Sequence, residues 1–309
     1  MSTASQPYIN YGSGILREAI KITACKKNEA SHFAICRGSN VKFVVRLRHG
    51  IPYLQKTVAA YNKKLALLLR CLPFIPPSIL HHAGLGYYSR ISLHPFLKPI
   101  LPSRNDWNVL VGTYDSSQKI VFQCFSEQNK TCLFVKVGNK GSAEQMEKEI
   151  RFLQKARDFE SFSIPKLKHA ELISEGAPFN IQVTDEFEGE KIPPVLNKEI
   201  YQIAKEIAGE PTLIDGIPHT FSHGDFAPWN IRKKGSSYTV FDWEHCKLRP
   251  EGYDIAYFVI VSEIALHRRK FDDAFCIAIE QIRQFDSDFQ IDKQLLRQEF
   301  EKSVKNLCF

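Results

Sequence analysis

The sequence predicts an α+β protein of antiparallel strands and helices, on three observations. β-rich runs joined by turn residues are typical of hairpins and occur at 33–47 and at 119–137. A helical spacing of apolar residues follows each hairpin, over about 51–72 and again over 142–156. The order of hairpin, helix and strand therefore occurs twice, once on each side of residue 105. This order fits either a degenerate duplication or the ordinary element order of an α+β fold, and both stay open.

Charge divides the chain at the same place. Residues 1–105 contain 15 Lys and Arg but only two acids, Glu18 and Glu29, which gives a net charge of +13. Residues 106–309 contain 26 basic and 32 acidic residues, which gives a net charge of −6. We therefore predict a separate basic N-terminal α+β unit over 1–105, whose proline-rich stretch 73–102 ends at the boundary. Such an excess of positive charge favours an anionic partner: a membrane surface, a nucleic acid or an acidic acceptor.

One helical segment bears on which anionic partner this unit contacts. Residues 63–75 combine Lys63, Lys64 and Arg70 with a strong apolar cluster, as a helix at an anionic membrane surface would. The same apolar stripe is also typical of a buried core helix, so both interpretations stay open. Nucleic acid is not favoured, because the basic residues are dispersed and no nucleic-acid-binding motif occurs.

The most informative segment lies in the second half of the chain, where an H-G-D triplet at 223–225 is followed by Asn230 and then by Asp242. Phosphoryl transfer needs a group that orients the attacking hydroxyl and ligands for a metal ion beside the phosphates. Asp225 is the candidate for the first task, and Asn230 and Asp242 are the candidates for the second. Residues 231–240 form a predicted hairpin that would bring Asn230 and Asp242 side by side.

The order H-G-D-x-x-x-x-N, followed by D-W-E at 242–244, resembles the aminoglycoside phosphotransferase and choline kinase superfamily. A Y-D-I-A-Y-F segment at 253–258 is similar to a further segment of that family. The resemblance implies a protein-kinase-like fold of two lobes that hold ATP. Residues 106–189 would form the N-lobe, an antiparallel sheet with a helix, together with the hinge. Residues 190–309 would form a mainly helical C-lobe.

The same resemblance implies roles for individual residues. Asp225 would be the catalytic residue, and Asn230 and Asp242 would bind Mg²⁺ beside the ATP phosphates. Asp254 would brace the catalytic loop. Because Asp225 is intact, we also predict that His223 supports the loop and is not a second base.

A kinase-like site also needs a strand lysine that holds phosphates and a helix glutamate that holds this lysine. Lys136 lies near the end of the second strand of the 119–137 hairpin. Glu149 lies one turn before Leu153 in the following helix, as in the E-x-x-x-L pattern of the family. We predict that Lys136 and Glu149 pair, with Glu147 as the alternative glutamate. Because solvated lysines and glutamates are common at such places, this prediction depends on the downstream motif.

A loop upstream of Lys136 is the candidate cover for the nucleotide phosphates. Residues 112–118 follow a predicted strand at 107–111 and contain a single glycine, Gly112. Backbone N–H groups and the hydroxyls of Ser116 and Ser117 would meet phosphate oxygens there. The match to a glycine-rich loop is weak, so the sequence predicts the position of the loop more firmly than each of its residues.

The candidate hinge follows two further predicted strands, at 167–173 and 179–183. Its backbone would face the adenine, and the residues that we predict there are Asp185, Glu186 and Phe187. Acidic residues are also typical of a solvated connection, so the side chains carry less weight than the position.

Composition places the chain among globular proteins, with 309 residues, 44% hydrophobic and 24% charged. The eight cysteines contain no C-x-x-C pair and no metal-like spacing, which predicts reduced thiols. The N-terminal segment lacks a signal-peptide core, and no apolar run approaches the roughly 20 residues that a membrane-spanning helix needs. We therefore expect a cytoplasmic protein, either soluble or peripheral at the inner face of the membrane.

Together these features predict an ATP- and Mg²⁺-dependent O-phosphotransferase. Only 35 residues separate Gly189 from Asp225, with one predicted helix at 197–208, so the wall over the acceptor is short and suits a bulky or extended substrate. The form HGDFAPWN with VFDWE is similar to superfamily members linked to bacterial surface polysaccharides, which favours a sugar or glycan-type acceptor. Two alternatives stay open: a choline, ethanolamine or aminoglycoside kinase, and a non-catalytic membrane- or glycan-binding adaptor with a kinase fold. The preference for ATP over GTP and the oligomeric state also stay open.

Overall fold

The structure is a computed structural model of the 309-residue chain. It describes residues 15–37, 40–47, 85–101, 106–125, 131–156, 158–187, 189–286 and 292–304, together with a few isolated positions between 67 and 83. The chain divides into two compact units. The first contains residues 1–147 and 166–186, and the second contains residues 148–165 and 187–309.

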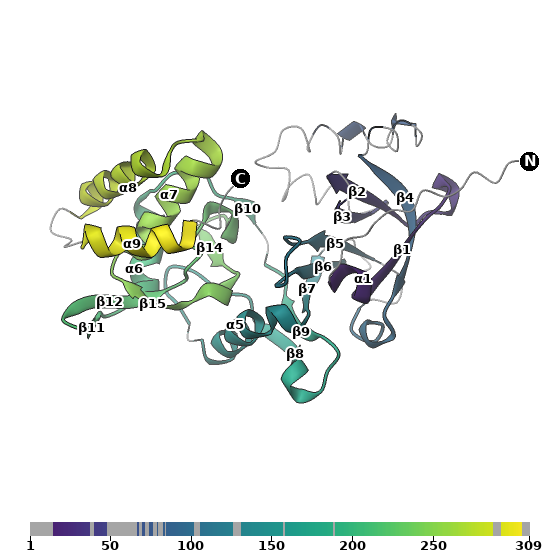
Figure 1. The fold of residues 1–309 in the computed structure, drawn as a ribbon, viewed down its shortest axis with the longest axis horizontal. Coiled ribbons are helices and arrows are strands. Elements are labelled where there is room, and N and C mark those ends of the chain that lie inside the picture. Colours follow the sequence, from purple (N-terminus) through teal and green to yellow (C-terminus); the bar gives the residue numbers. More distant parts are fainter. Residues whose placement is uncertain are drawn as a thin grey trace, which may run out of the picture. The chain divides into compact units, whose positions relative to one another are not determined.

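The first unit is built on one nine-stranded sheet in which all neighbouring strands pair antiparallel (Figure 1). The order across the sheet is β1-β4-β2-β3-β5-β6-β7-β9-β8. The strands are β1 Ile20–Ala24, β2 His32–Arg37, β3 Asn40–Arg46, β4 Gly86–Leu93, β5 Trp107–Val111, β6 Lys119–Phe125, β7 Thr131–Gly138, β8 Leu167–Glu171 and β9 Asn180–Asp185. A short helix, α1 (Ile15–Ala19), precedes β1.

This sheet joins strands from both sides of residue 105, because β3 pairs with β5 through Phe43 and Leu110. The strands β5 to β9, with helix α5 (Ala143–Lys155) between β7 and β8, confirm the predicted α+β class with an antiparallel sheet and a helix. Both predicted hairpins are present, as β2–β3 and β6–β7. The domain boundaries at residues 105 and 189 stay predictions.

Alternating apolar residues of these strands form the core of the first unit. In β6, Ile120, Phe122 and Cys124 alternate along one face of the strand and are fully buried in this core, and Gln123 and Phe125 on the other face are buried as well. Helix α1 contacts β6 and contributes Ile15 and Leu16 to the same core. Burial of this face therefore fixes the register of the central strands.

Neither α1 nor β1 was predicted, and the strand expected before residue 105, where the structure has β4, was predicted without bounds. The strand β4 lies inside the stretch 73–102 that the sequence analysis described only as proline-rich. Its prolines flank Gly86–Leu93 and do not interrupt it, so the ladder keeps its N–H donors. The predicted helix over 51–72 and the membrane-surface segment 63–75 lie outside the described residues, apart from isolated positions.

The second unit is mainly helical and carries two small sheets. Its helices are α6 Lys198–Ala208, α7 Tyr253–His267, α8 Phe271–Phe285 and α9 Lys293–Val304. The sheets are β10-β13-β14 and β11-β12-β15, with β10 Glu190–Lys191, β11 Thr212–Ile214, β12 Ile217–Ser222, β13 Ile231–Lys234, β14 Ser237–Val240 and β15 Lys247–Pro250. The predicted hairpin over 231–240 is β13–β14, and the helix predicted at 197–208 is α6, with Asn197 capping it by accepting from Ile200 N–H at 2.9 Å.

Helix α7 lies at the centre of this unit, grouped with α8 and α9 in Figure 1. Its first ten residues, Tyr253 to Ser262, are all buried, so the helix has no solvent face over this stretch. Tyr253, Phe258 and Phe300 of α9 are among the largest fully buried side chains. The first turns of α7 directly follow β15, which is hydrogen-bonded to β12, and the H-G-D triplet begins where β12 ends.

Within the described part of the chain, no helix combines the length and the apolar character needed to cross a membrane. The six cysteines that the structure describes are free thiols.

Candidate active site

The loop between β12 and β13 carries the H-G-D triplet and Asn230. Asn230 ends a short 3₁₀ turn, Pro228–Asn230, and its amide points back to Asp225. The Asn230 Nδ2 donates to the backbone oxygen of Asp225 at 2.9 Å and to its Oδ2 at 2.8 Å. Because Asp225 takes the amide nitrogen, Oδ1 is the atom with which Asn230 would bind a cation. Asp225 and Asn230, which the sequence analysis chose from their spacing in H-G-D-x-x-x-x-N, thus contact each other directly.

Asp254, in the first turn of α7, holds this loop through a buried carboxylate. Its Oδ1 accepts hydrogen bonds from Ser222 Oγ at 2.7 Å and from the Gly224 N–H at 3.0 Å. Its Oδ2 accepts one from the His223 N–H at 2.6 Å. These donors lie where the chain leaves β12, so without Asp254 they would be buried and unpaired. The geometry supports the predicted bracing role.

His223 links the loop to the segment that carries Asp242. Its Nε2 donates to the Phe241 carbonyl at 3.0 Å, and the Asp225 N–H donates to its Nδ1 at 3.2 Å, which assigns the proton to Nε2. Burial of the imidazole lowers the pKa of His223, which keeps the ring neutral and lets Nδ1 accept. This supports a positioning role for His223 and not a role as second base.

The β13–β14 hairpin brings Asn230 and Asp242 to the same end of a small sheet. Asn230 directly precedes β13, and Phe241 separates the end of β14 from Asp242. The Phe241 N–H donates to the Asn230 carbonyl at 3.1 Å. Asp242 adopts the left-handed conformation, with φ 73° and ψ 57°. Aspartate tolerates this conformation better than most residues, and it turns the chain into the 3₁₀ turn Trp243–His245.

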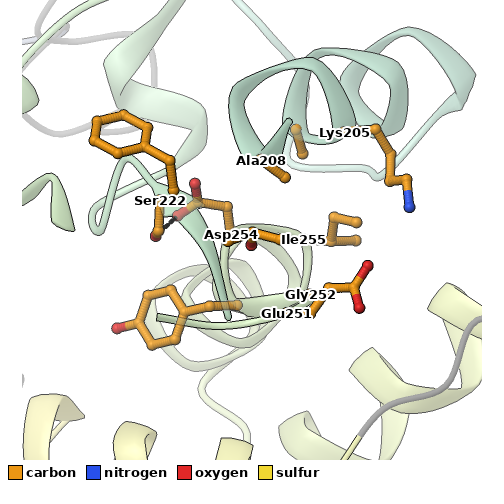
Figure 2. A pocket seen from close by; sticks show the side chains of 11 residues that line it. Lys205, Ala208, Ser222, Glu251, Gly252, Asp254 and Ile255 are labelled. Carbon is orange, nitrogen blue, oxygen red and sulfur yellow. Dashed lines mark hydrogen bonds between the residues drawn. The ribbon is translucent and has the colours of Figure 1, made fainter. Parts of the chain in front are cut away.

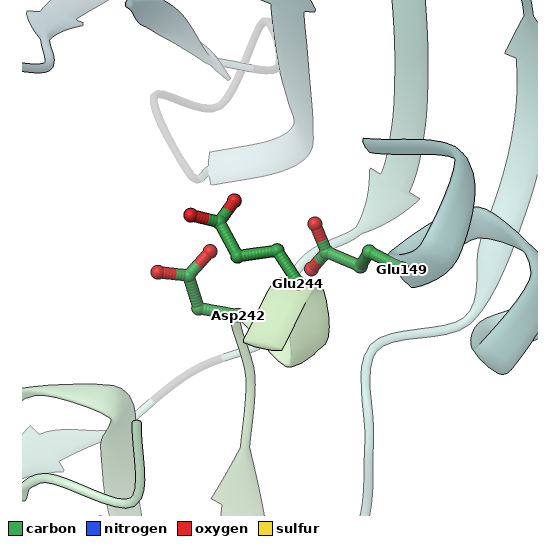
Figure 3. Close-up of side chains that lie close together, drawn as sticks. All are labelled: Glu149, Asp242 and Glu244. Atoms are coloured by element: carbon green, nitrogen blue, oxygen red, sulfur yellow. The ribbon is translucent and has the colours of Figure 1, made fainter. Parts of the chain in front are cut away.

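Three carboxylates gather at this turn. Oxygen atoms of Glu149, Asp242 and Glu244 all lie within 4.8 Å of one another, and Figure 3 shows the three side chains grouped at the turn. Glu149 comes from α5, is buried, and accepts from the Trp243 N–H at 3.2 Å. The structure thus places Glu149 in the second unit beside Asp242, while Lys136 belongs to the first unit. The pairing of Lys136 with Glu149 stays a prediction.

Trp243 anchors the turn in the core of the second unit. Its side chain is fully buried, its ring stacks on Phe152 at 4.2 Å between centroids, and its Nε1 donates to the Val240 carbonyl at 3.1 Å. The His223 ring lies 4.5 Å from it. The tryptophan of the D-W-E segment therefore fixes the backbone on which Asp242 and Glu244 are mounted.

Asp225 is a carboxylate of the site with a raised pKa. Its Oδ1 accepts a hydrogen bond from the Tyr257 hydroxyl at 2.7 Å. Burial, and then the negative charge of Asp242, raises the pKa of Asp225 to about 7, while the hydrogen bonds from Tyr257 and Asn230 act in the opposite direction. A carboxyl with a pKa near neutrality is suited to accepting a proton from a substrate hydroxyl.

The oxygen ligands that these side chains offer fit a hard divalent cation. Carboxylate and amide oxygens are the ligands that Mg²⁺ prefers. Asp242 and Glu244 offer them at this turn, and Asn230 offers one at the same end of the β13–β14 hairpin. Glu149, Asp242 and Glu244 repel each other at such short separations, and a cation would offset this repulsion. Asn230 and Asp242 are the residues that would hold such a cation, with Glu244 as an additional ligand.

The other predicted nucleotide residues belong to the first unit or to its junction with the second. Gly112 follows β5 and donates its N–H to the Lys119 carbonyl at 2.9 Å. Ser117 donates both its N–H and its hydroxyl to Asp115 Oδ1 at 2.8 Å, and Ser116 is exposed in the same turn. Lys136 lies on β7, opposite Gln182 of β9. Their contacts with a nucleotide stay predictions.

At the candidate hinge, the residues divide between the units. Asp185 ends β9, and its Oδ1 accepts from the Lys166 N–H at 2.7 Å, so this side chain stabilises the entry to β8. Glu186 is the last residue of the first unit, and Phe187 is the first of the next segment of the second. The Phe187 ring stacks on Phe241 at 4.4 Å, one residue before Asp242.

The sequence analysis missed two residues that the structure brings to the site. Glu244 was read only as part of the D-W-E triplet, and the structure brings its carboxylate close to that of Asp242. Tyr257 was read only as part of the segment 253–258. It lies three residues after Asp254 on α7, which puts it on the same helix face and within reach of the same loop.

A small cavity lies behind Asp254 (Figure 2). Lys205 and Ala208 of α6 line it, together with Ser222 and with Glu251 and Gly252 at the start of α7. Its volume of about 10 Å³ holds no more than one water molecule. The cavity is therefore too small for a substrate and belongs to the support of the loop.

Gly224 provides a test of how tightly this loop is packed. Its φ is +84°, and a Cβ there would lie 2.3 Å from the His245 carbonyl oxygen. Gly235, in the β13–β14 turn, also has a positive φ of +61° but has nothing within 4 Å of the added Cβ. We expect Gly224→Ala to reduce the free energy of unfolding by about 2 kcal/mol more than Gly235→Ala, since only Gly224→Ala adds a backbone clash to the conformational strain.

Thermal unfolding of the two variants and of the wild type measures this difference. Equal melting temperatures for Gly224→Ala and Gly235→Ala would show that the loop can move away from His245 without cost.

Comparisons with known proteins gave matches among solved structures alone: no family model matches the chain, and no curated protein matches it. The chain is similar to an amicoumacin kinase, hAmiN, in complex with AMP-PNP, Ca²⁺ and Ami, with 12% identity, a TM-score of 0.35, and 59% of this chain and 73% of that chain covered. It is also similar to a thermostable mutant of the aminoglycoside phosphotransferase APH(4)-Ia in a ternary complex with ADP and hygromycin B, with 10% identity, a TM-score of 0.34, and 63% and 89% covered.

A third similar structure is a choline/ethanolamine kinase family protein from Mesorhizobium loti, with 13% identity, a TM-score of 0.33, and 61% of this chain and 84% of that chain covered. All three carry names from the superfamily that the H-G-D-x-x-x-x-N and D-W-E segments resemble. At these identities and TM-scores, the likeness says nothing about the activity, substrate or ligands of this chain.

Proposed function

We propose that the chain is an ATP- and Mg²⁺-dependent O-phosphotransferase that transfers the γ-phosphate of ATP to a hydroxyl of a sugar or glycan-type acceptor. One observation carries the proposal. Asp225 is hydrogen-bonded to Asn230, and Asn230 lies at the same hairpin end as Asp242 and its neighbouring carboxylates. This arrangement combines a candidate base with oxygen ligands for a metal ion, which are the groups that phosphoryl transfer needs.

In this proposal Asp225 orients the acceptor hydroxyl and takes its proton. The hydroxyl oxygen forms a bond to the γ-phosphorus, the bond from the γ-phosphorus to the β–γ bridging oxygen breaks, and ADP leaves with that oxygen. Bound Mg²⁺ would neutralise phosphate charge. Asn230 holds Asp225 through Nδ2 and would direct Oδ1 to the metal, while Asp254 and His223 keep the loop backbone fixed. The site works by positioning, with little covalent chemistry of its own.

The nucleotide contacts in this proposal come from residues predicted by sequence. Lys136 would bind phosphates and would be held by Glu149, and the loop with Gly112, Ser116 and Ser117 would cover them. The backbone of Asp185 to Phe187 would face the adenine. The flat stack of Phe187 on Phe241 supports an aromatic surface beside that segment.

The type of acceptor is proposed from the charge of residues 1–105 and from the length of the segment between Gly189 and Asp225. The net charge of +13 on residues 1–105 supports an anionic acceptor or an anionic surface close to it, such as the inner face of a membrane. The short segment between Gly189 and Asp225, which contains α6, β11 and β12, supports an acceptor that is too large to be enclosed. A glycan with acidic groups meets both conditions.

Turnover with a panel of acceptors tests this function. The protein is incubated with ATP and Mg²⁺ and with acidic oligosaccharides, neutral sugars, choline, ethanolamine or hygromycin B, and ADP and phosphorylated product are measured by mass spectrometry. We expect phosphate on an oligosaccharide. Phosphate on choline or on the antibiotic would retain the kinase and overturn the acceptor. If no acceptor in the panel leads to ADP formation, and the protein binds glycan or liposomes through residues 1–105, the non-catalytic adaptor is favoured.

A further inference from the structure

We propose that Tyr257 is a positioning residue for Asp225, which fixes the orientation of the carboxylate toward the acceptor hydroxyl. The inference rests on the proposed function, because it assigns Asp225 the task of orienting that hydroxyl. Tyr257 lies outside the H-G-D loop and the D-W-E segment, in the segment 253–258, for which the sequence analysis predicted a role for Asp254 alone.

The two oxygens of Asp225 have donors from two different elements. The Tyr257 hydroxyl, from α7, donates to Oδ1 at 2.7 Å. The Asn230 amide, from the turn before β13, donates to Oδ2 at 2.8 Å. A carboxylate that is bonded at both oxygens cannot rotate about its Cβ–Cγ bond without breaking one bond. Each oxygen retains a second lone pair, so the carboxylate can still accept from a substrate hydroxyl.

The Tyr257 ring is itself held in place. It is 6% exposed and packs beside two aromatic rings, Tyr253 at 5.8 Å and Phe300 of α9 at 6.2 Å between centroids. Tyr253 in turn stacks on Phe300 at 4.6 Å and lies under the Arg249 guanidinium at 4.2 Å. Such packing leaves the ring little freedom, so its hydroxyl is a fixed donor and not an adaptable one.

One helix therefore positions both the loop and its reactive group. Asp254 and Tyr257 lie three residues apart on α7, which puts them on one face. Asp254 accepts from the backbone of the loop, and Tyr257 donates to the Asp225 side chain. Movement of α7 would displace backbone and carboxylate together, which preserves their relative placement.

The test is the variant Tyr257→Phe, which removes one oxygen and keeps the packed ring. We expect kcat to fall by about 10- to 100-fold, as for loss of a hydrogen bond to a charged group, while KM for ATP and for the acceptor changes by less than about 2-fold. Tyr201→Phe is the matched control, because the Tyr201 hydroxyl also donates to an aspartate, Asp286, at 3.2 Å, remote from the loop. We expect wild-type kcat for this control.

A double variant separates positioning from general support of the fold. If Tyr257 acts through Asp225, then Asp225→Asn with Tyr257→Phe will be no slower than Asp225→Asn alone. A double variant whose kcat falls by the product of the two single-variant losses would overturn the proposal. Wild-type kcat for Tyr257→Phe would overturn it as well.

Should the wild type transfer no phosphate at all, the proposed function fails, and positioning is then judged by crystal structures. Asp225 in two or more conformers in Tyr257→Phe supports it, and a single unchanged conformer overturns it.

Discussion

Replacement of Asp225 by Asn is expected to lower kcat by about 10²- to 10⁴-fold, the range for loss of a general base, while nucleotide binding stays close to that of the wild type. Asn keeps the size of the side chain and one acceptor oxygen, so the hydrogen bond from Asn230 or from Tyr257 can persist. It cannot take a proton from the acceptor. The loss should therefore appear in the chemical step and not in binding.

The control for this change is Asp215→Asn, which makes the same substitution at an exposed position of the β11–β12 turn. Asp215 has a φ of 52°, a conformation that Asn also adopts readily, so this variant should fold and turn over like the wild type. Steady-state kinetics of both variants, with calorimetric nucleotide binding, measures the effect. Near-normal turnover by Asp225→Asn would remove Asp225 from its proposed role.

The local arrangement around Asp225 could be predicted because it depends on short sequence separations. Asn230 lies five residues after Asp225. The 3₁₀ turn Pro228–Asn230, just before β13, returns the Asn230 amide to Asp225. The hairpin over 231–240 was predictable from a β-rich strand and a Lys-Lys-Gly-Ser-Ser turn, and it sets Asp242 beside Asn230. Local turn chemistry thus determines most of the candidate site.

The contacts from other elements could not be predicted in the same way. Helix α7 is buried on all sides over Tyr253 to Ser262, so no amphipathic stripe indicates which side chains face the loop. The pairing of Glu149 with Lys136 stays a prediction from a family pattern. The bond that Glu149 accepts from the Trp243 N–H, 94 residues away in sequence, was not predicted. Such contacts depend on packing between distant segments, which a single sequence does not specify.

The fold of the first unit shows the same limit. The hairpins β2–β3 and β6–β7 were evident from turn residues, but the pairing of β3 with β5 that joins them into one sheet depends on Phe43, Val44, Val109 and Leu110. Nothing in their local sequence distinguishes this pairing from two separate sheets. The sequence therefore predicted the strands of this region more completely than their order.

Loss of the Asp242 carboxylate is expected to abolish metal-dependent nucleotide binding. Asp242 lies in the group of three carboxylates and at the hairpin end next to Asn230, so it is a charged ligand that Mg²⁺ would use. Because Asp242 has a φ of 73°, Asp242→Ala also strains the backbone. Asp242→Asn separates the two effects, since Asn accepts this conformation but lacks the charge. We expect both variants to lose the metal-dependent part of binding.

Calorimetric titration of a non-hydrolysable ATP analogue, with and without Mg²⁺, into the wild type and both Asp242 variants tests the central claim most directly. The account predicts binding by the wild type that strengthens at least about 10-fold with Mg²⁺, and variants whose binding no longer responds to the metal. Wild-type protein that binds no nucleotide at millimolar concentration, or Asp242 variants that respond to Mg²⁺ as the wild type does, would contradict a phosphoryl-transfer site at this turn.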